Sequence, residues 1–138
     1  MKVVINRCFG GFSLSRQAVR RLAQLHNRPC YFFEDGGRGG KTRWIPLDDD
    51  DKAYCAFAFD VPNPQDQPQE TLFKQHYIDS RPDNRTDPLL VRVVEELGEA
   101  ASGDLAQLAI VEIPDRTDWE LDDYDGIETI HEKHRSWS

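Results

Sequence analysis

The stretch that decides the fold runs over residues 87–113 and reads DPLLVRVVEELGEAASGDLAQLAIVEI. Asp87 predicts a helix start, because its carboxylate accepts hydrogen bonds from free N–H groups, and Pro88 suits the first helical turn. Apolar residues then recur at helical spacing on one face, and Gly103 is expected to end the helix. These apolar residues are Leu90, Val93, Val94, Leu97 and Ala101. The apolar run over residues 106–113 predicts a central strand covered on both faces.

Outward from this stretch, the patterns predict an α+β fold. A β-branched run indicates a first strand over residues 2–6, and alternating apolar residues indicate another over 54–59. A second helix is expected near residues 15–26, where Ser15 or Ser13 caps the start and Asn27 and Pro29 follow the end. We expect one globular domain over residues 1–138, in which a single mixed β-sheet packs against two main helices, near 15–26 and 88–101.

Charge and composition narrow the classes of function. The chain of 138 residues has a formal net charge of -8, so non-specific nucleic-acid binding, which needs a basic surface, is not expected. An acidic protein suits basic surfaces of other proteins. No signal peptide or membrane-spanning apolar run is found, so a cytoplasmic protein is expected.

The three cysteines are expected to be free thiols. Cys8, Cys30 and Cys55 are odd in number and show no CxxC pair, which excludes an even disulfide framework. A reducing compartment is the simplest explanation. Cys8 near a helix start also permits a reactive thiol, but nothing marks a partner base.

Two glycine-containing loops are candidate anion sites. Gly10 and Gly11 lie between the first strand and the first helix, so their N–H groups, with Arg7 or Arg16, are suited to phosphate. A plain tight turn is the alternative.

The second loop, residues 35–42, reads DGGRGGKT and resembles a P-loop only superficially. Asp35 stands where the first glycine belongs and no helix follows, so nucleoside triphosphatase activity is rejected. Arg38 and Lys41 remain candidates for gripping a phosphate, and simple hairpin flexibility is the alternative.

The C-terminal segment over residues 124–137 carries the third candidate site. Glu128, His131, His134 and Arg135 lie close together in sequence. On a helix the two histidines are neighbours and can share a metal, whereas on a strand they point to opposite faces and cannot. We expect no metal. The segment is expected to be ordered and packed, through Ile127 and Ile130 if it is helical and through Trp137, although a charged surface tail is the alternative.

The two ends of the chain carry a resemblance. Residues 1–15 (MKVVINRCFGGFSLS), together with YDGIE at 124–128 and EKHRSW at 132–137, resemble a family of small proteins of unknown function in bacteriophages and prophages. The resemblance implies an accessory role in the host cytoplasm, in which the protein binds a host defence or regulatory protein or sequesters a phosphorylated small molecule. It carries over no catalytic residues.

We therefore expect a binding protein without a cofactor, whose ligand is a host protein or a phosphorylated small molecule. Self-association is left open. The alternative is a small hydrolase or nuclease that uses Glu128, His131 and His134. Geometry separates the two, because an enzyme needs these side chains to converge in one cleft.

Overall fold

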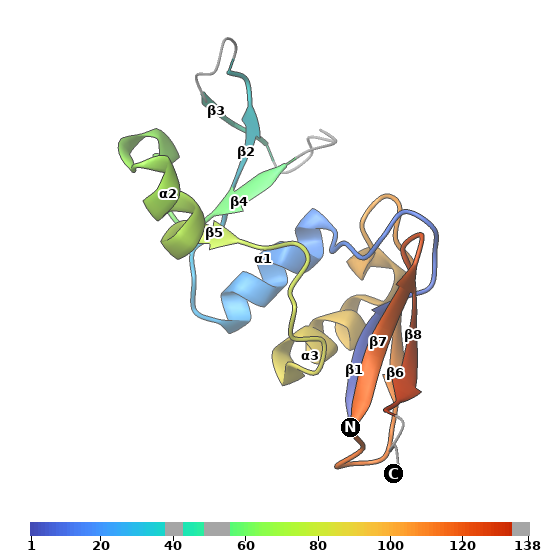
Figure 1. Cartoon of the computed structure of the whole chain (residues 1–138). Helices are drawn as coiled ribbons and strands as arrows, with labels where there is room; N and C mark the ends of the chain where they lie inside the picture. Colours follow the sequence, from blue (N-terminus) through green and yellow to red (C-terminus); the bar gives the residue numbers. More distant parts are fainter. Residues whose placement is uncertain (38–42, 49–55, 134–138) are drawn as a thin grey trace. The chain divides into compact units, whose positions relative to one another are not determined.

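The computed structural model describes residues 1–37, 43–48 and 56–133 (Figure 1). The chain forms two compact units, Met1–Ala18 with Ser80–Ser138 and, separately, Val19–Asp79. Helices and strands are both present, so the predicted α+β class is confirmed. The single mixed sheet is wrong, because the described strands form three separate sheets in which every pair is antiparallel. Folding as one domain stays a prediction.

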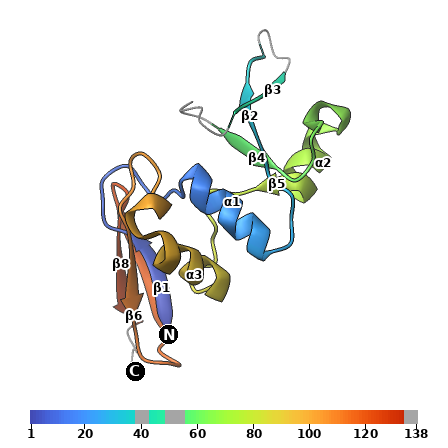
Figure 2. The ribbon, with the colours of Figure 1, turned by 180° about the vertical axis from the view of Figure 1, so that it is seen from behind.

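In the first unit, a strand near the start of the chain pairs with a strand from its last third. Strand β1 (Lys2–Asn6) pairs antiparallel with β6 (Leu108–Glu112), so that Val3 lies opposite Val111. Helix α3 (Pro88–Leu97) packs against both strands (Figures 1 and 2). The β1 strand is fully buried at its centre, so it forms the core of this unit.

Helix α3 starts where the sequence predicts and ends earlier. The Asp87 carboxylate accepts a hydrogen bond of 3.0 Å from the Leu89 N–H, which confirms the predicted cap. The helix ends at Gly98, which has a φ of 58°, and a 3₁₀ turn η3 (Gly98–Ala101) follows. Gly103 as the predicted stop is therefore wrong, because Gly98 takes the positive φ first.

Strand β6 is not the central strand that its apolar sequence predicts. Among the described residues it pairs with β1 alone. Its four apolar side chains are all half-buried, and regular pairing covers residues 108–112 of the predicted 106–113. An apolar run indicates that side chains on both faces of the strand are partly buried, but it does not require a neighbouring strand on each edge.

The C-terminal part of the first unit is a β-hairpin. Strand β7 (Trp119–Tyr124) pairs with β8 (Ile127–Glu132) around Asp125 and Gly126, whose φ values of 50° and 91° suit a tight two-residue turn. The hairpin lies on the side of β1 and β6 away from α3 (Figures 1 and 2).

The second unit contains a four-stranded antiparallel sheet with the order β3-β2-β4-β5. The strands are β2 (Tyr31–Asp35), β3 (Trp44–Pro46), β4 (Phe57–Phe59) and β5 (Tyr77–Ile78). The predicted strand over 54–59 is thus a strand from residue 57, and residues 54 and 55 lie outside the described residues.

Aromatic side chains fill one side of this sheet. Phe33, Trp44 and Phe59 pack with Leu72 into a buried cluster, and the Trp44 ring meets the Phe59 ring edge-on at 4.9 Å. Leu72 comes from a helical segment that crosses this side. The segment comprises η1 (Pro64–Asp66), α2 (Gln69–Thr71) and the π-helical turn η2 (Leu72–His76).

Helix α1 (Arg16–Leu25) matches its prediction closely. The Ser15 hydroxyl oxygen accepts a hydrogen bond of 3.1 Å from the Ala18 N–H, which is the expected cap. Asn27 has a φ of 57° and ends the helix in the left-handed conformation, as its position before Pro29 predicts.

Candidate functional site

A buried ion pair holds the hairpin to the core of the first unit. The Glu128 side chain is 4% exposed and lies on β8. Its Oε1 accepts hydrogen bonds from Arg85 Nη1 at 2.6 Å and from the Asn6 N–H at 2.8 Å, and its Oε2 accepts one from Arg85 Nη2 at 3.0 Å. This two-pronged contact is the strong form of an Arg–carboxylate pair. We call Asn6, Arg85 and Glu128 the clasp.

The remaining polar atoms of the clasp are also bonded within the first unit. Asn6 Nδ2 donates to the carbonyls of Cys8 at 2.7 Å and Gly126 at 2.6 Å, while its Oδ1 accepts from the Gln107 N–H at 2.8 Å. The Arg85 guanidinium carbon lies 3.6 Å from the centre of the Phe12 ring. A buried polar cluster with this many internal bonds stabilises and orients the chain. Glu128 therefore serves the fold in this structure.

The Gly10–Gly11 turn is occupied by the hairpin. The Gly10 N–H donates to the Asp125 carbonyl at 3.3 Å, and Gly126 packs so closely on Gly11 that no side chain would fit between them. The turn also does not lead straight into α1, because Leu14 first forms a β-bridge with Ser102. The donors predicted for a phosphate thus face the chain's own hairpin, and Arg7 and Arg16 flank this turn in sequence.

His131 and Glu128 do not converge. They lie three residues apart on a strand, so His131 is on the exposed outer face while Glu128 points inward. His131 Nε2 lies 2.6 Å from Asp122 Oδ2 and 3.3 Å from Thr129 Oγ1. A Thr–His–Asp relay needs the carboxylate and the hydroxyl on opposite ring nitrogens, and here both contact one.

The other predicted site residues, Arg38, Lys41, His134 and Arg135, lie outside the described residues, as does Trp137. Because Ile127–Glu132 is a strand, the helical arrangement that would bring Ile127 and Ile130 together is wrong. The side chain that enters the core from this segment is Glu128. The segment is ordered over its described part.

The outer face of the hairpin is acidic and carries an exposed aromatic ring. The pairing places Glu120 opposite His131, Asp122 opposite Thr129 and Tyr124 opposite Ile127, all on this face. Tyr124 is 75% exposed and stands next to the turn. We call these residues the outer hairpin face. Glu120 and Asp122 are exposed beside the tyrosine, so the face presents negative charge around an aromatic anchor.

A second polar cluster lies in the other unit and was not anticipated from the sequence. Asp60 Oδ2 accepts from Arg28 Nη2 at 2.9 Å and Nε at 3.3 Å, while His76 Nδ1 lies 2.8 Å from Asp60 Oδ1. Burial raises the pKa of Asp60, but the hydrogen bonds and charges of Arg28 and His76 outweigh burial and leave the pKa below its usual value. We call these residues the Asp60 cluster.

Sequence signals for both clusters were faint. Glu128 lies on the inward face of the hairpin, beside the Leu121–Ile130 pair and the half-buried Trp119, and an acid that is buried among apolar residues indicates a buried cation. The other two acids on this face, Asp123 and Glu132, are exposed. Nothing in the sequence singles out Arg85 as that cation. For the Asp60 cluster, the only signal is that Asp60 is the first polar residue after the apolar strand β4.

The cysteines and the possible metal ligands can be placed only within the described residues. Cys8 and Cys30 are free thiols, and Cys55 lies outside the described residues. Within the described ranges, no group of three or more His, Cys, Asp or Glu side chains is placed to hold a metal ion. No helix in the described part of the chain has the length and apolar character needed to cross a bilayer.

Comparison with known proteins gave no match: no family model, curated protein or solved structure is similar to this chain.

Proposed function

We propose that this chain is a phage-type accessory protein that acts by binding a basic surface of a host protein through the outer hairpin face. The observation that carries the proposal is Tyr124, which is 75% exposed beside the acidic residues Glu120 and Asp122. Tyrosine is enriched among the residues that dominate binding energy at protein interfaces. The surrounding carboxylates favour a partner with the opposite charge.

The clasp supports this proposal because it removes flexibility from the hairpin. Glu128 is hydrogen-bonded to β1 through Asn6 and to the loop before α3 through Arg85, so β8 is fastened on its inner side. The opposite side of the same strand remains exposed at Thr129 and His131. A surface that is already ordered loses less conformational entropy on binding, which raises affinity.

A protein partner is favoured over a phosphorylated small molecule at the Gly10–Gly11 turn, whereas Arg38 and Lys41 lie outside the described residues. The Gly10 N–H, the donor that a phosphate would use, is bonded to Asp125. The hydrolase or nuclease alternative has less support, because Glu128 is buried in the clasp while His131 is on the other face. The proposed location is the host cytoplasm.

Photo-crosslinking tests the proposal. A photoreactive phenylalanine analogue at position 124 is expected to crosslink, in bacterial cells, to one predominant protein with a basic surface. The matched control places the same analogue at position 105, where Leu105 is also well exposed, at 59%, but is not on the outer hairpin face. That position should not yield the same crosslink.

The purified partner then gives the decisive measurement. Tyr124→Ser is expected to weaken binding by about tenfold or more, since it removes the aromatic anchor. Added salt should slow association with the wild-type protein, because salt screens the charges. A partner that binds Tyr124→Ser and a Glu120→Lys/Asp122→Lys variant as tightly as the wild type would rule out the outer hairpin face.

A further inference from the structure

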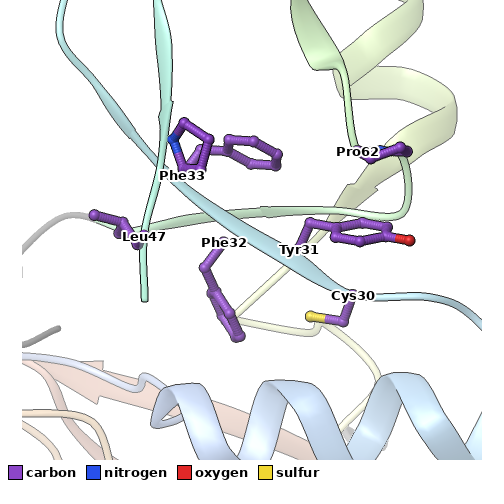
Figure 3. Close-up of a pocket in the computed structure, with 7 residues that line it drawn as sticks. Cys30, Tyr31, Phe32, Phe33, Leu47 and Pro62 are labelled. Atoms are coloured by element: carbon purple, nitrogen blue, oxygen red, sulfur yellow. The ribbon is translucent and has the colours of Figure 1, made fainter. Parts of the chain in front are cut away.

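The second unit contains an open-sided cavity of about 190 Å³. It is lined by Cys30, Tyr31, Phe32, Phe33, Pro46, Leu47 and Pro62 (Figure 3). Tyr31 lies below Pro62 in this view, while Phe32 and the Cys30 sulfur point to the other side of β2. The lining is mostly aromatic and aliphatic. Since an apolar cavity of about 150 Å³ can hold benzene, this one has room for a single substituted ring.

The Asp60 cluster joins two of the chain segments that line the cavity. Arg28 and Asp60 each precede a lining residue by two positions, Cys30 and Pro62 respectively, and the Arg28–Asp60 ion pair joins these two segments. The positive charge of Arg28 acts on the Cys30 thiol. Burial raises the pKa of Cys30 from 9.0 to about 11, and the charges of Arg20 and Arg28 act against this rise. The thiol is therefore protonated and unreactive at neutral pH.

The Asp60 cluster holds two hydrogen-bonding nitrogens that are not used within it. Arg28 donates to Asp60 through Nε and Nη2, and His76 contacts Asp60 through Nδ1. Arg28 Nη1 and His76 Nε2 have no partner among the described residues. Asp60 fixes the orientation of both side chains, as a carboxylate does for ligand-binding histidines and arginines. Arg28 Nη1 is then a positively charged donor on a residue two positions before the lining residue Cys30.

We propose that this cavity binds a small organic anion that combines one planar apolar ring with a carboxylate or phosphate group. The ring lies against Tyr31 and Pro62, and the anionic group accepts a hydrogen bond from Arg28 Nη1. His76 Nε2 adds a second donor when the ring is protonated. The Tyr31 side chain is 41% exposed even though it lines the cavity, which leaves the entrance side of the ring available to a ligand. This site is in the second unit and does not depend on the partner proposed for the hairpin.

Nuclear magnetic resonance titration tests the proposal with three probes of one ring each: benzoate, phenyl phosphate and the neutral benzyl alcohol. The two anions are expected to shift the amide signals of Cys30, Tyr31 and Leu47, with benzoate binding about tenfold more tightly than benzyl alcohol because only the anion pairs with Arg28. The better-bound anion identifies which acidic group the site prefers.

Variants separate the charge from the cavity. Arg28→Gln should weaken benzoate binding by about tenfold and leave benzyl alcohol binding unchanged, whereas Arg28→Lys should retain most of the benzoate affinity. The matched control is Arg21→Gln, which removes an arginine of the same unit that donates to Gln24, and it should have no effect. Equal affinity for benzoate and benzyl alcohol, no loss in Arg28→Gln, or the absence of shifts at Cys30 and Tyr31 would overturn the proposal.

Discussion

The clasp and the Asp60 cluster have the same plan but differ in exposure. In each, one carboxylate contacts an arginine and one further residue. Glu128 is only 4% exposed, whereas the Asp60 side chain is 19% exposed. Every polar group of Asn6 and Glu128 is directed into the first unit, while Arg28 and His76 each retain a nitrogen without a partner among the described residues. The buried cluster has its polar groups satisfied within its own unit, and the half-buried one is where we propose that a ligand binds.

The largest effect expected from this comparison is on stability, from Glu128→Ala. The substitution leaves the Arg85 charge buried without its partner, so the free energy of unfolding should fall by about 3–5 kcal/mol. Urea unfolding measures it. Glu132→Ala, in the same strand but exposed, should change stability by less than about 0.5 kcal/mol. Similar losses of unfolding free energy in the two variants would show that the clasp does not hold the hairpin to the core of the first unit.

Gly126→Ala should have the next largest effect, because a Cβ at this position meets the backbone of Gly10 and Gly11. Gly11→Ala is the matched control, since Gly11 has nearly the same φ, 92° against 91°, but open space around it. Both variants incur the strain of a positive φ, of about 1–2 kcal/mol, and Gly126→Ala should lose at least about 1 kcal/mol more. Thermal unfolding compares them, and equal losses would mean that the hairpin turn does not pack on this glycine turn.

The smallest effect should come from Asp60→Asn, at about 1 kcal/mol or less, because partly exposed ion pairs contribute little. The folded-state pKa of Asp60 is lowered, so its contribution is present above the unfolded-state pKa and is lost as the pH falls through the folded-state pKa. The difference in unfolding free energy between wild type and Asp60→Asn should therefore shrink in acid. A difference that grows in acid would refute the assignment.

The sequence predicted the ends of helices and hairpin strands well where a single capping or turn residue determines the end. Ser15 and Asp87 cap helices because a single side-chain oxygen within the same few residues satisfies the free N–H groups. The Asp125–Gly126 turn follows from the positive φ that these two residues tolerate. Gly98 was missed as the helix end because the alanines that follow it continue the helical pattern.

Contacts between residues that are far apart in the chain could not be predicted from the sequence. The partner of Glu128 is 43 positions away in the chain, and several other arginines offered the same charge. The occupation of the Gly10 N–H by Asp125 depends on the hairpin folding back onto the first loop. The apolar run at β6 predicted a strand but not its neighbours, because hydrophobicity records burial and not hydrogen-bond pairing. The Asp60 cluster likewise joins three segments that no local spacing relates.

Amide hydrogen exchange at Asn6 tests most directly whether the clasp holds the hairpin in one fixed orientation. Its N–H donates to the Glu128 carboxylate and to no backbone carbonyl, so its protection reports the clasp itself. We expect this N–H to exchange only on global unfolding, with an exchange free energy equal to the free energy of unfolding from urea. An exchange free energy several kcal/mol lower, while the amides of β1 paired with β6 stay protected, would show that the hairpin detaches and that the clasp does not hold it.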